Sequence, residues 1–172
     1  MTAPSVVRIA RPEDHLEIWR LFLQGYSENG ISSLAPEKVN WLINRCLNPD
    51  LIPLGDTGSR GVIGVIGPVG ALEGVVFVTI GMHWYSYDKI LQESIVLVDV
   101  EHRKSNHAHV LIQWMKDQSE ITGLPLMAGI VSNHKTEAKC RLYRRMLPKI
   151  GEVYYYGPKG SNMPIALAAS SS

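Results

Sequence analysis

The chain has 172 residues with nearly balanced charge, 17 Lys plus Arg against 16 Asp plus Glu. This length fits one domain of ordinary size, and 45% hydrophobic with 19% charged residues excludes a disordered chain. The net charge of +1 argues against a strongly basic nucleic-acid-binding protein. Its two cysteines, Cys46 and Cys140, form no paired motif. We therefore expect neither a disulfide framework nor a zinc module, and we expect a reducing cytoplasm as the compartment.

The apolar segments favour a soluble protein. The chain opens without the charged and apolar regions of a secretory signal, so none is expected. The longest apolar stretch, from Gly61 to Leu72, is broken by Gly67-Pro68, whereas a membrane helix needs about 20 apolar residues. We expect a single domain over residues 1–168 and a disordered tail over residues 169–172.

The first part of the chain predicts one strand and two helices. Ser5–Ile9 is a β-branched run typical of a strand. A helix is expected from Pro12, with apolar residues at helical spacing and Gly25 as its stop. A second amphipathic helix opens at Pro36 and ends before Asn48-Pro49.

The middle of the chain predicts three strands. Gly61–Ile66, Gly74–His83 and Ile90–Val100 are rich in Val and Ile. Turn residues separate them at Gly67-Pro68 and at Tyr87-Asp88. Because the connections are short, these strands are expected to form an antiparallel meander.

The last part alternates helices and strands. We expect a helix from about Lys104 to Thr122, a strand at Leu126–Val131, and a helix from about Lys135 to Leu147. Further strands are expected at Glu152–Tyr156 and at Met163–Ala168. The last strand–helix–strand unit should be a parallel, right-handed crossover. The whole order predicts a mixed α/β fold built around one sheet.

The segment from Val96 to His109 carries the most chemical information. A hydrophobic strand ends there, a polar turn follows, and a helix begins. Such a junction favours an anion, because the first backbone N–H groups of a helix lack partners and its dipole is positive at this end. The segment therefore predicts a phosphate-binding site.

Within it, Arg103-Lys-Ser-Asn106-His-Ala108 resembles a motif of the GNAT family of acyl-CoA-dependent N-acetyltransferases. The family pattern is Gln or Arg, two residues, Gly, one residue, then Gly or Ala. Asn106 stands where the first glycine is usual, and Asn is the other residue that tolerates left-handed backbone geometry. The order of elements from Val6 to about Tyr156 also matches the family.

The resemblance implies a GNAT-like acyl-CoA N-acyltransferase fold, with a mostly antiparallel central sheet and helices on its flanks. The strand ending at Val100 and the strand Leu126–Val131 should form a splayed parallel pair that opens a slot for the pantetheine arm. It also implies acetyl-CoA as co-substrate, with no metal. The cofactor-binding residues that it implies are Leu97, Val98, Arg103, Lys104, Ser105, Asn106, His107, Ala108, His109 and Asn133.

The implied mechanism is direct attack of a primary amine on the acetyl thioester. Backbone N–H groups near Leu97 and Val98 would stabilise the oxyanion. By the same resemblance, Tyr143 would give a proton to the leaving thiolate. Glu93 is the first candidate for the base that takes the amine's proton, and His83 is the second. The sequence does not identify the acceptor, which is a small molecule or a protein amine.

Other interpretations of the same residues stay open. Without the resemblance, Tyr143 is a core-edge aromatic and Glu93 a solvent-facing strand residue. The alternative function is a catalytically inactive acyl-CoA-binding or interaction module, for which Asn106 and the lack of a clear base leave room.

Several other residues suggest partners. The basic run between Lys135 and Lys149 is either a solvated helix face or the neighbour of an anion, such as the cofactor phosphates. Nucleic acid is disfavoured by the balanced charge, and no membrane contact is expected. His102, His107 and His109 point apart at this spacing, so they predict no metal site. A homodimer stays open.

Overall fold

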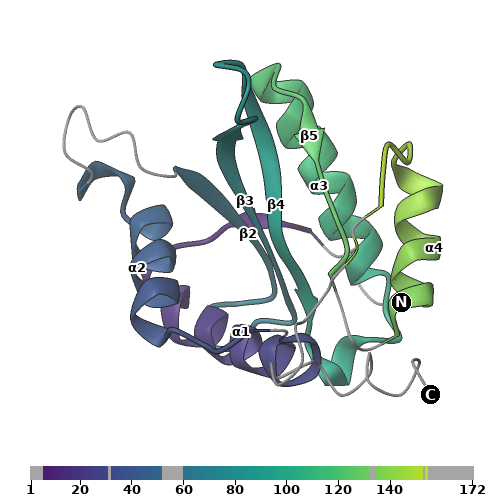
Figure 1. The fold of residues 1–172 in the computed structure, drawn as a ribbon. Coiled ribbons are helices and arrows are strands. Elements are labelled where there is room, and N and C mark those ends of the chain that lie inside the picture. The colour runs from purple at the N-terminus through teal and green to yellow at the C-terminus, as the bar shows by residue number, and fades with distance from the viewer. Residues whose placement is uncertain (1–5, 31, 52–59, 132–134, 153, 155–172) are drawn as a thin grey trace.

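The computed structural model describes residues 6–30, 32–51, 60–131, 135–152 and 154. No helix among them combines the length and apolar character needed to cross a membrane. Figure 1 shows a central sheet with helices around it. In chain order the elements are β1 (Arg8–Ile9), η1 (Pro12–Asp14), α1 (His15–Asn29), α2 (Pro36–Leu47), η2 (Pro49–Leu51), β2 (Gly61–Ile66), β3 (Gly74–Met82), β4 (Lys89–Val98), η3 (Val100–His102), α3 (His107–Thr122), β5 (Leu126–Met127) and α4 (Thr136–Met146).

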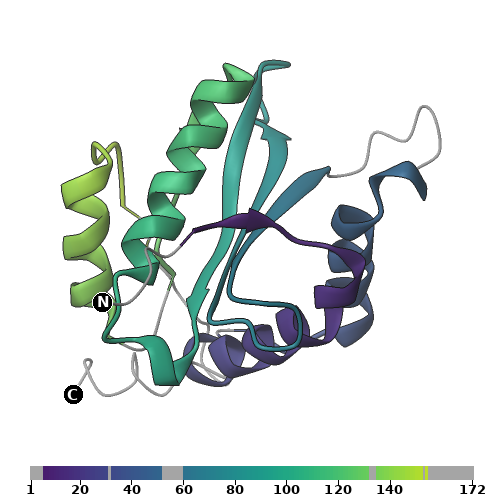
Figure 2. The same cartoon turned by 180° about the vertical axis from the view of Figure 1, so that it is seen from behind.

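The sheet has the order β1-β2-β3-β4-β5. Strands β1 to β4 pair antiparallel, which confirms the predicted meander of β2, β3 and β4. The short β1 lies at the edge beside β2 (Figure 2). At the other edge β5 runs parallel to β4 after the crossover through α3. The mixed α/β fold with one parallel pair is therefore as the sequence predicted.

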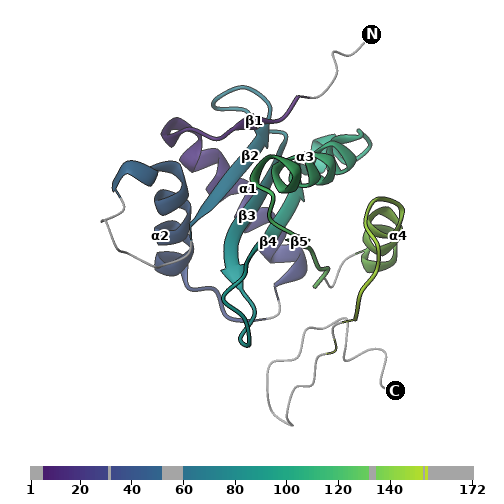
Figure 3. The ribbon, with the colours of Figure 1, turned by 90° about the horizontal axis from the view of Figure 1, so that it is seen from above.

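Helices cover both faces of the sheet. On one face α1 and α2 contribute a buried cluster with Ile18, Leu21 and Ile43, and α3 and α4 pack on the other face (Figure 3). Neighbouring residues of β3 alternate between these layers, because Val75 belongs to the first cluster and Val76 to the second. This explains why β3 is a continuous apolar run rather than an alternating one.

Helix α1 continues past its predicted stop. Gly25 is buried inside the helix, which ends at Asn29, so the expectation of a C-terminal cap at Gly25 is wrong. A Cβ on Gly25 would lie 2.3 Å from a methyl carbon of Leu97 in β4. The glycine therefore lets α1 approach β4 closely, at the usual cost of about 1 kcal/mol for glycine within a helix.

Some predicted bounds also differ. Helix α3 begins at His107 rather than near Lys104, because the chain first forms the short helix η3. Strand β5 ends at Met127 rather than at Val131. Glu152 and Tyr154 are not in a strand. The strand expected at residues 163–168 and the tail at residues 169–172 lie outside the described residues, as do residues 153, 155 and 156 of the strand that would complete the last crossover.

The C-terminal end of β4 is fixed by ionic contacts with α1. Nη1 of Arg20 lies 2.5 Å from Oδ2 of Asp99, and Nη2 donates to the carbonyl of Leu72 at 2.9 Å. The other oxygen of Asp99 accepts the backbone N–H of Glu101 at 2.9 Å, which starts η3. This network positions the turn that leads from β4 into α3.

Candidate active site

The sheet splays along the outer edge of β4. Strand β5 pairs with β4 only at Leu91 and Gln92, opposite Leu126 and Met127, while β4 continues to Val98. The edge of β4 after Gln92 is therefore unpaired with β5. This is the splayed parallel pair that the sequence predicted.

A β-bulge lies where the splay begins. In the β3–β4 ladder Phe77 pairs with Ile95 but Val78 pairs with Glu93, so Ser94 is an extra residue in β4. Ser94 and Ile95 both line a cavity on the α1–α2 face. In a regular strand side chains alternate between the faces, so Glu93 would share a face with Ile95. The extra residue Ser94 takes that face instead, and Glu93 therefore lies on the opposite face, toward α4.

Glu93 meets Tyr143 of α4 on that face. The hydroxyl of Tyr143 donates to Oε1 of Glu93 at 2.7 Å. The other oxygen, Oε2, is buried and has no hydrogen-bond partner among the described residues. The two residues that the sequence analysis selected as catalytic, 50 positions apart, thus form one hydrogen-bonded pair.

Burial dominates the acid–base chemistry of this pair. It raises the pKa of Glu93 from 4.5 to about 7, although hydrogen bonds from Tyr143 and from the backbone of Gly129 act in the opposite direction. Burial and the neighbouring carboxylate also raise the pKa of Tyr143 above its usual range. Near pH 7 Glu93 is therefore poised to accept a proton, while Tyr143 stays protonated and donates.

The turn before α3 is held by Ser105. Its backbone N–H and its hydroxyl both donate to the carbonyl of His102, at 3.0 and 2.6 Å, and the hydroxyl accepts the N–H of His107 at 3.2 Å. Asn106 has a φ of −89°, so this position adopts ordinary backbone geometry. The left-handed conformation anticipated there is not used. Lys104, Ser105 and Asn106 are all exposed.

Comparisons with known proteins support the same architecture. No protein-family model matches the chain, and no curated protein matches it. Among solved structures, an aminoglycoside acetyltransferase from an uncultured soil metagenomic sample has a TM-score of 0.61 at 14% identity, covering 90% of this chain and 95% of the other. AAC(6')-Iy, solved in complex with the bisubstrate analogue CoA-S-monomethyl-acetylneamine, has a TM-score of 0.62 at 15% identity, covering 91% of this chain and 99% of the other.

A ribosomal-protein-alanine N-acetyltransferase from Brucella melitensis biovar Abortus 2308 has a TM-score of 0.59 at 15% identity, with 89% of this chain and 99% of the other covered. These matches extend over nearly the whole of both chains. The chain has the GNAT fold. At these identities the likeness concerns the fold, and the chemistry must be argued from this chain's own residues.

On this GNAT fold the backbone direction distinguishes Leu97 from Val98. The N–H of Asp99 donates to the carbonyl of Glu73, so it points away from the open edge of β4. Because donors alternate along an antiparallel ladder, the N–H of Leu97 points the same way, and that of Val98 points to the open edge. Of the two predicted oxyanion donors, Val98 is the one directed toward the splay.

Several side chains of the predicted cofactor segment face other parts of the protein. Arg103 donates through Nη2 to both carboxylate oxygens of Glu28 in α1, at 2.7 and 2.8 Å. His107 is buried, and its Nε2 lies 2.6 Å from Oε2 of Glu73. Arg103 and His107 therefore fix the turn, and ligand contacts in this segment fall to backbone groups and to exposed side chains such as His109.

The remaining predicted residues divide as follows. Ala108 is half-buried in the first turn of α3, beside the exposed His109. Asn133 lies outside the described residues. His83, the second candidate base, stacks on Tyr85 beyond the end of β3, with ring centroids 5.2 Å apart. No group of three or more His, Cys, Asp or Glu residues in the described ranges could hold a metal ion.

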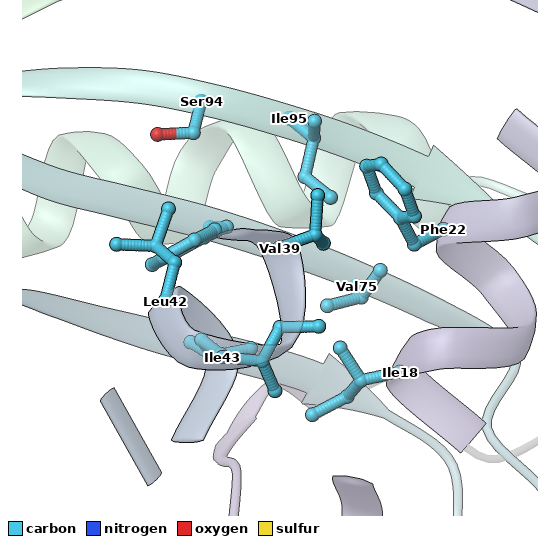
Figure 4. Close-up of a pocket in the computed structure, with 10 residues that line it drawn as sticks. Ile18, Phe22, Val39, Leu42, Ile43, Val75, Ser94 and Ile95 are labelled. Atoms are coloured by element: carbon cyan, nitrogen blue, oxygen red, sulfur yellow. The ribbon is translucent and has the colours of Figure 1, made fainter. Parts of the chain in front are cut away.

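Two hollows beside α1 and α2 were missed by sequence reasoning. The first has a volume of about 220 Å³ and lies between α1, α2 and the sheet (Figure 4). Its lining is Ile18, Phe22, Val39, Leu42, Ile43, Ile63, Val75, Phe77, Ser94 and Ile95. The second, of about 400 Å³, lies at the end of α1 and the start of α2 and reaches Val131. Cavities depend on tertiary packing, so no local sequence pattern predicts them.

Proposed function

We propose that this protein transfers an acetyl group from acetyl-CoA to a primary amine. The observation that carries the proposal is the Glu93–Tyr143 pair, which lies where β4 and β5 separate on a GNAT fold. A carboxylate whose pKa is about 7 is matched to removing a proton from an amine at neutral pH. The buried Oε2 of Glu93, which has no hydrogen-bond partner among the described residues, is available to take that proton.

The turn and the start of α3 suit the phosphates of the co-substrate. The segment 103–109 contains no acidic residue, and its central residues are exposed. Helix α3 has 16 residues, so its N-terminal N–H groups and its dipole favour an anion. Acetyl-CoA would supply the acetyl thioester. Lys104 to His109 would hold its phosphates through main-chain groups, and the edge of β4 at Val98 would orient the thioester carbonyl.

The pair provides a route for the proton that passes from a neutral amine to sulfur, and an amine that arrives as ammonium first loses one proton to solvent. As the amine nitrogen forms its bond to the carbonyl carbon, the carboxylate of Glu93 takes a proton from it. Tyr143 gives its proton to the departing sulfur as the C–S bond breaks, and recovers one from Glu93. The transfer must be concerted, because a phenol with a raised pKa is a weaker acid than a thiol. The proton lost by nitrogen thus ends on sulfur.

Calorimetric titration with CoA and acetyl-CoA tests the binding half of this proposal. Ser105→Pro should weaken binding more than Arg103→Ala does, because proline removes the N–H of the turn while Arg103 contacts Glu28 rather than the ligand. Steady-state thiol release with a panel of amines tests the catalytic half. Binding without turnover for any amine would favour the inactive module instead, and no saturable binding at millimolar ligand would remove both.

A further inference from the structure

The cavity between α1, α2 and the sheet is large for a well-packed core. Protein interiors leave few voids larger than one water molecule, and an apolar cavity of about 150 Å³ is enough for benzene. This cavity has about 220 Å³, and its lining side chains are aliphatic or aromatic with the exception of Ser94 (Figure 4). It would suit an apolar group somewhat larger than a benzene ring, and it offers little to a polar one.

The second hollow adjoins the cavity at the end of α1 and the start of α2. The two share Phe22 and Val39, and the second extends to Asn29 of α1 and to Val131, which follows β5. Its lining adds hydroxyl, amide and ammonium groups from Tyr26, Asn29, Ser32, Ser33 and Lys38. Among the described residues that line the two hollows, none carries a carboxylate. An acceptor with several ammonium groups would therefore meet no opposite charge along this lining, and Lys38 would repel it.

We propose that the acceptor is a small monoamine with an apolar or aromatic group, and that this group inserts into the cavity. The proposal rests on the proposed function. Ser94 and Ile95, which line the cavity, directly follow Glu93 in β4. An acceptor anchored there therefore needs to pass only the unpaired edge of one strand to present its amine to Glu93. The same lining offers no counter-charge to an aminoglycoside, which carries several amines, so we expect no binding of such an acceptor here.

Binding of two probe amines to the full chain tests this assignment. Calorimetry with 2-phenylethylamine should give saturable heat, and sisomicin should give none. Val39→Phe fills the cavity from α2, and Ser94→Leu fills it from an exposed position that tolerates change. Each should weaken 2-phenylethylamine binding at least about tenfold, since the buried apolar surface is lost. Affinity for acetyl-CoA should stay the same, with circular dichroism to verify folding.

Val7→Phe is the matched control, because Val7 is half-buried and packs on the opposite face of the sheet. It should bind 2-phenylethylamine like the unmodified chain. Acetyl-CoA-dependent turnover of sisomicin without 2-phenylethylamine binding would overturn this inference and leave the proposed function intact. So would binding that neither filling variant weakens. Binding of 2-phenylethylamine by a chain that does not bind acetyl-CoA would uphold the cavity and remove the proposed function.

Discussion

Replacing Glu93 with glutamine should stabilise the protein, and the gain should grow with pH. Burial raises the pKa of this carboxyl from 4.5 to about 7. The difference of about 2.5 corresponds to about 3 kcal/mol, at about 1.4 kcal/mol for each pKa unit. Glutamine keeps an oxygen that can accept the hydrogen bond of Tyr143, but it carries no charge. The variant therefore removes the buried charge and places an NH2 group where Oε2 lies, and the effect of the NH2 group does not vary with pH.

The sign of this pH dependence follows from the higher pKa of Glu93 in the folded chain than in the unfolded chain. Below pH 4.5 the carboxyl is protonated in both the folded and the unfolded chain, so no buried charge exists. As pH rises toward about 7, the unfolded chain loses the proton first, and folding becomes less favourable. Above about pH 7 the folded chain holds a buried carboxylate and bears the whole cost. The unmodified protein thus loses stability relative to Glu93→Gln across this window.

Urea unfolding of both proteins at about pH 5 and about pH 8 measures the effect, because all other titrating groups cancel in the comparison. The free-energy difference should increase by about 2–3 kcal/mol between the two conditions, slightly less than the full effect because the unfolded chain is already mostly ionised at about pH 5. Glu120→Gln, on the exposed side of α3, controls for the loss of one carboxylate away from the pair. A difference that stays constant with pH would refute the argument that Glu93 is held in a poorly solvated site.

Two further predictions concern other contacts. Tyr143→Phe should lower turnover by about 10²–10⁴ with little change in CoA affinity, since it removes one proton donor. It should also move the acidic limb of the kcat/KM pH profile to higher pH, because the lost hydrogen bond favours the charged form of Glu93. Asp14→Ala should lower the free energy of unfolding, measured in urea, by about 3 kcal/mol. The buried Asp14 accepts hydrogen bonds from Arg8 at 2.7 and 2.8 Å, and the substitution removes this carboxylate partner of Arg8.

Much of the fold could be predicted because its signals are local. Val and Ile runs with short turns specify the meander, and helical periodicity specifies the four α-helices. The prediction failed at Gly25, where a residue that usually stops helices serves a close approach to Leu97 of β4. That contact joins residues 72 positions apart, so no window of sequence contains its cause. A glycine in the sequence therefore does not show whether a helix ends there or approaches another element closely there.

The candidate site was only partly predictable for a related reason. Tyr143 and Glu93 were selected separately, and their hydrogen bond depends on how α4 packs beside the splayed sheet. The roles suggested for Arg103 and His107 did not include their contacts with Glu28 and Glu73, since a motif names positions but not the direction of side chains. One signal was available: three consecutive polar residues, 92–94, interrupt an apolar strand where the bulge occurs.

Three irregular features coincide at Glu93, and their coincidence argues for function more strongly than any one of them. The bulge at Ser94 interrupts the ladder with β3, the departure of β5 leaves an edge unpaired, and burial raises the pKa of a carboxyl. Each costs stability where a regular strand with an apolar side chain would not. Together they place a carboxyl with a raised pKa on one face of β4 and an apolar cavity on the other. If Glu93 is the base of the proposed function, stability and activity are opposed at this position: the Glu93→Gln protein should be more stable at high pH and should have lost the proposed acetyl transfer.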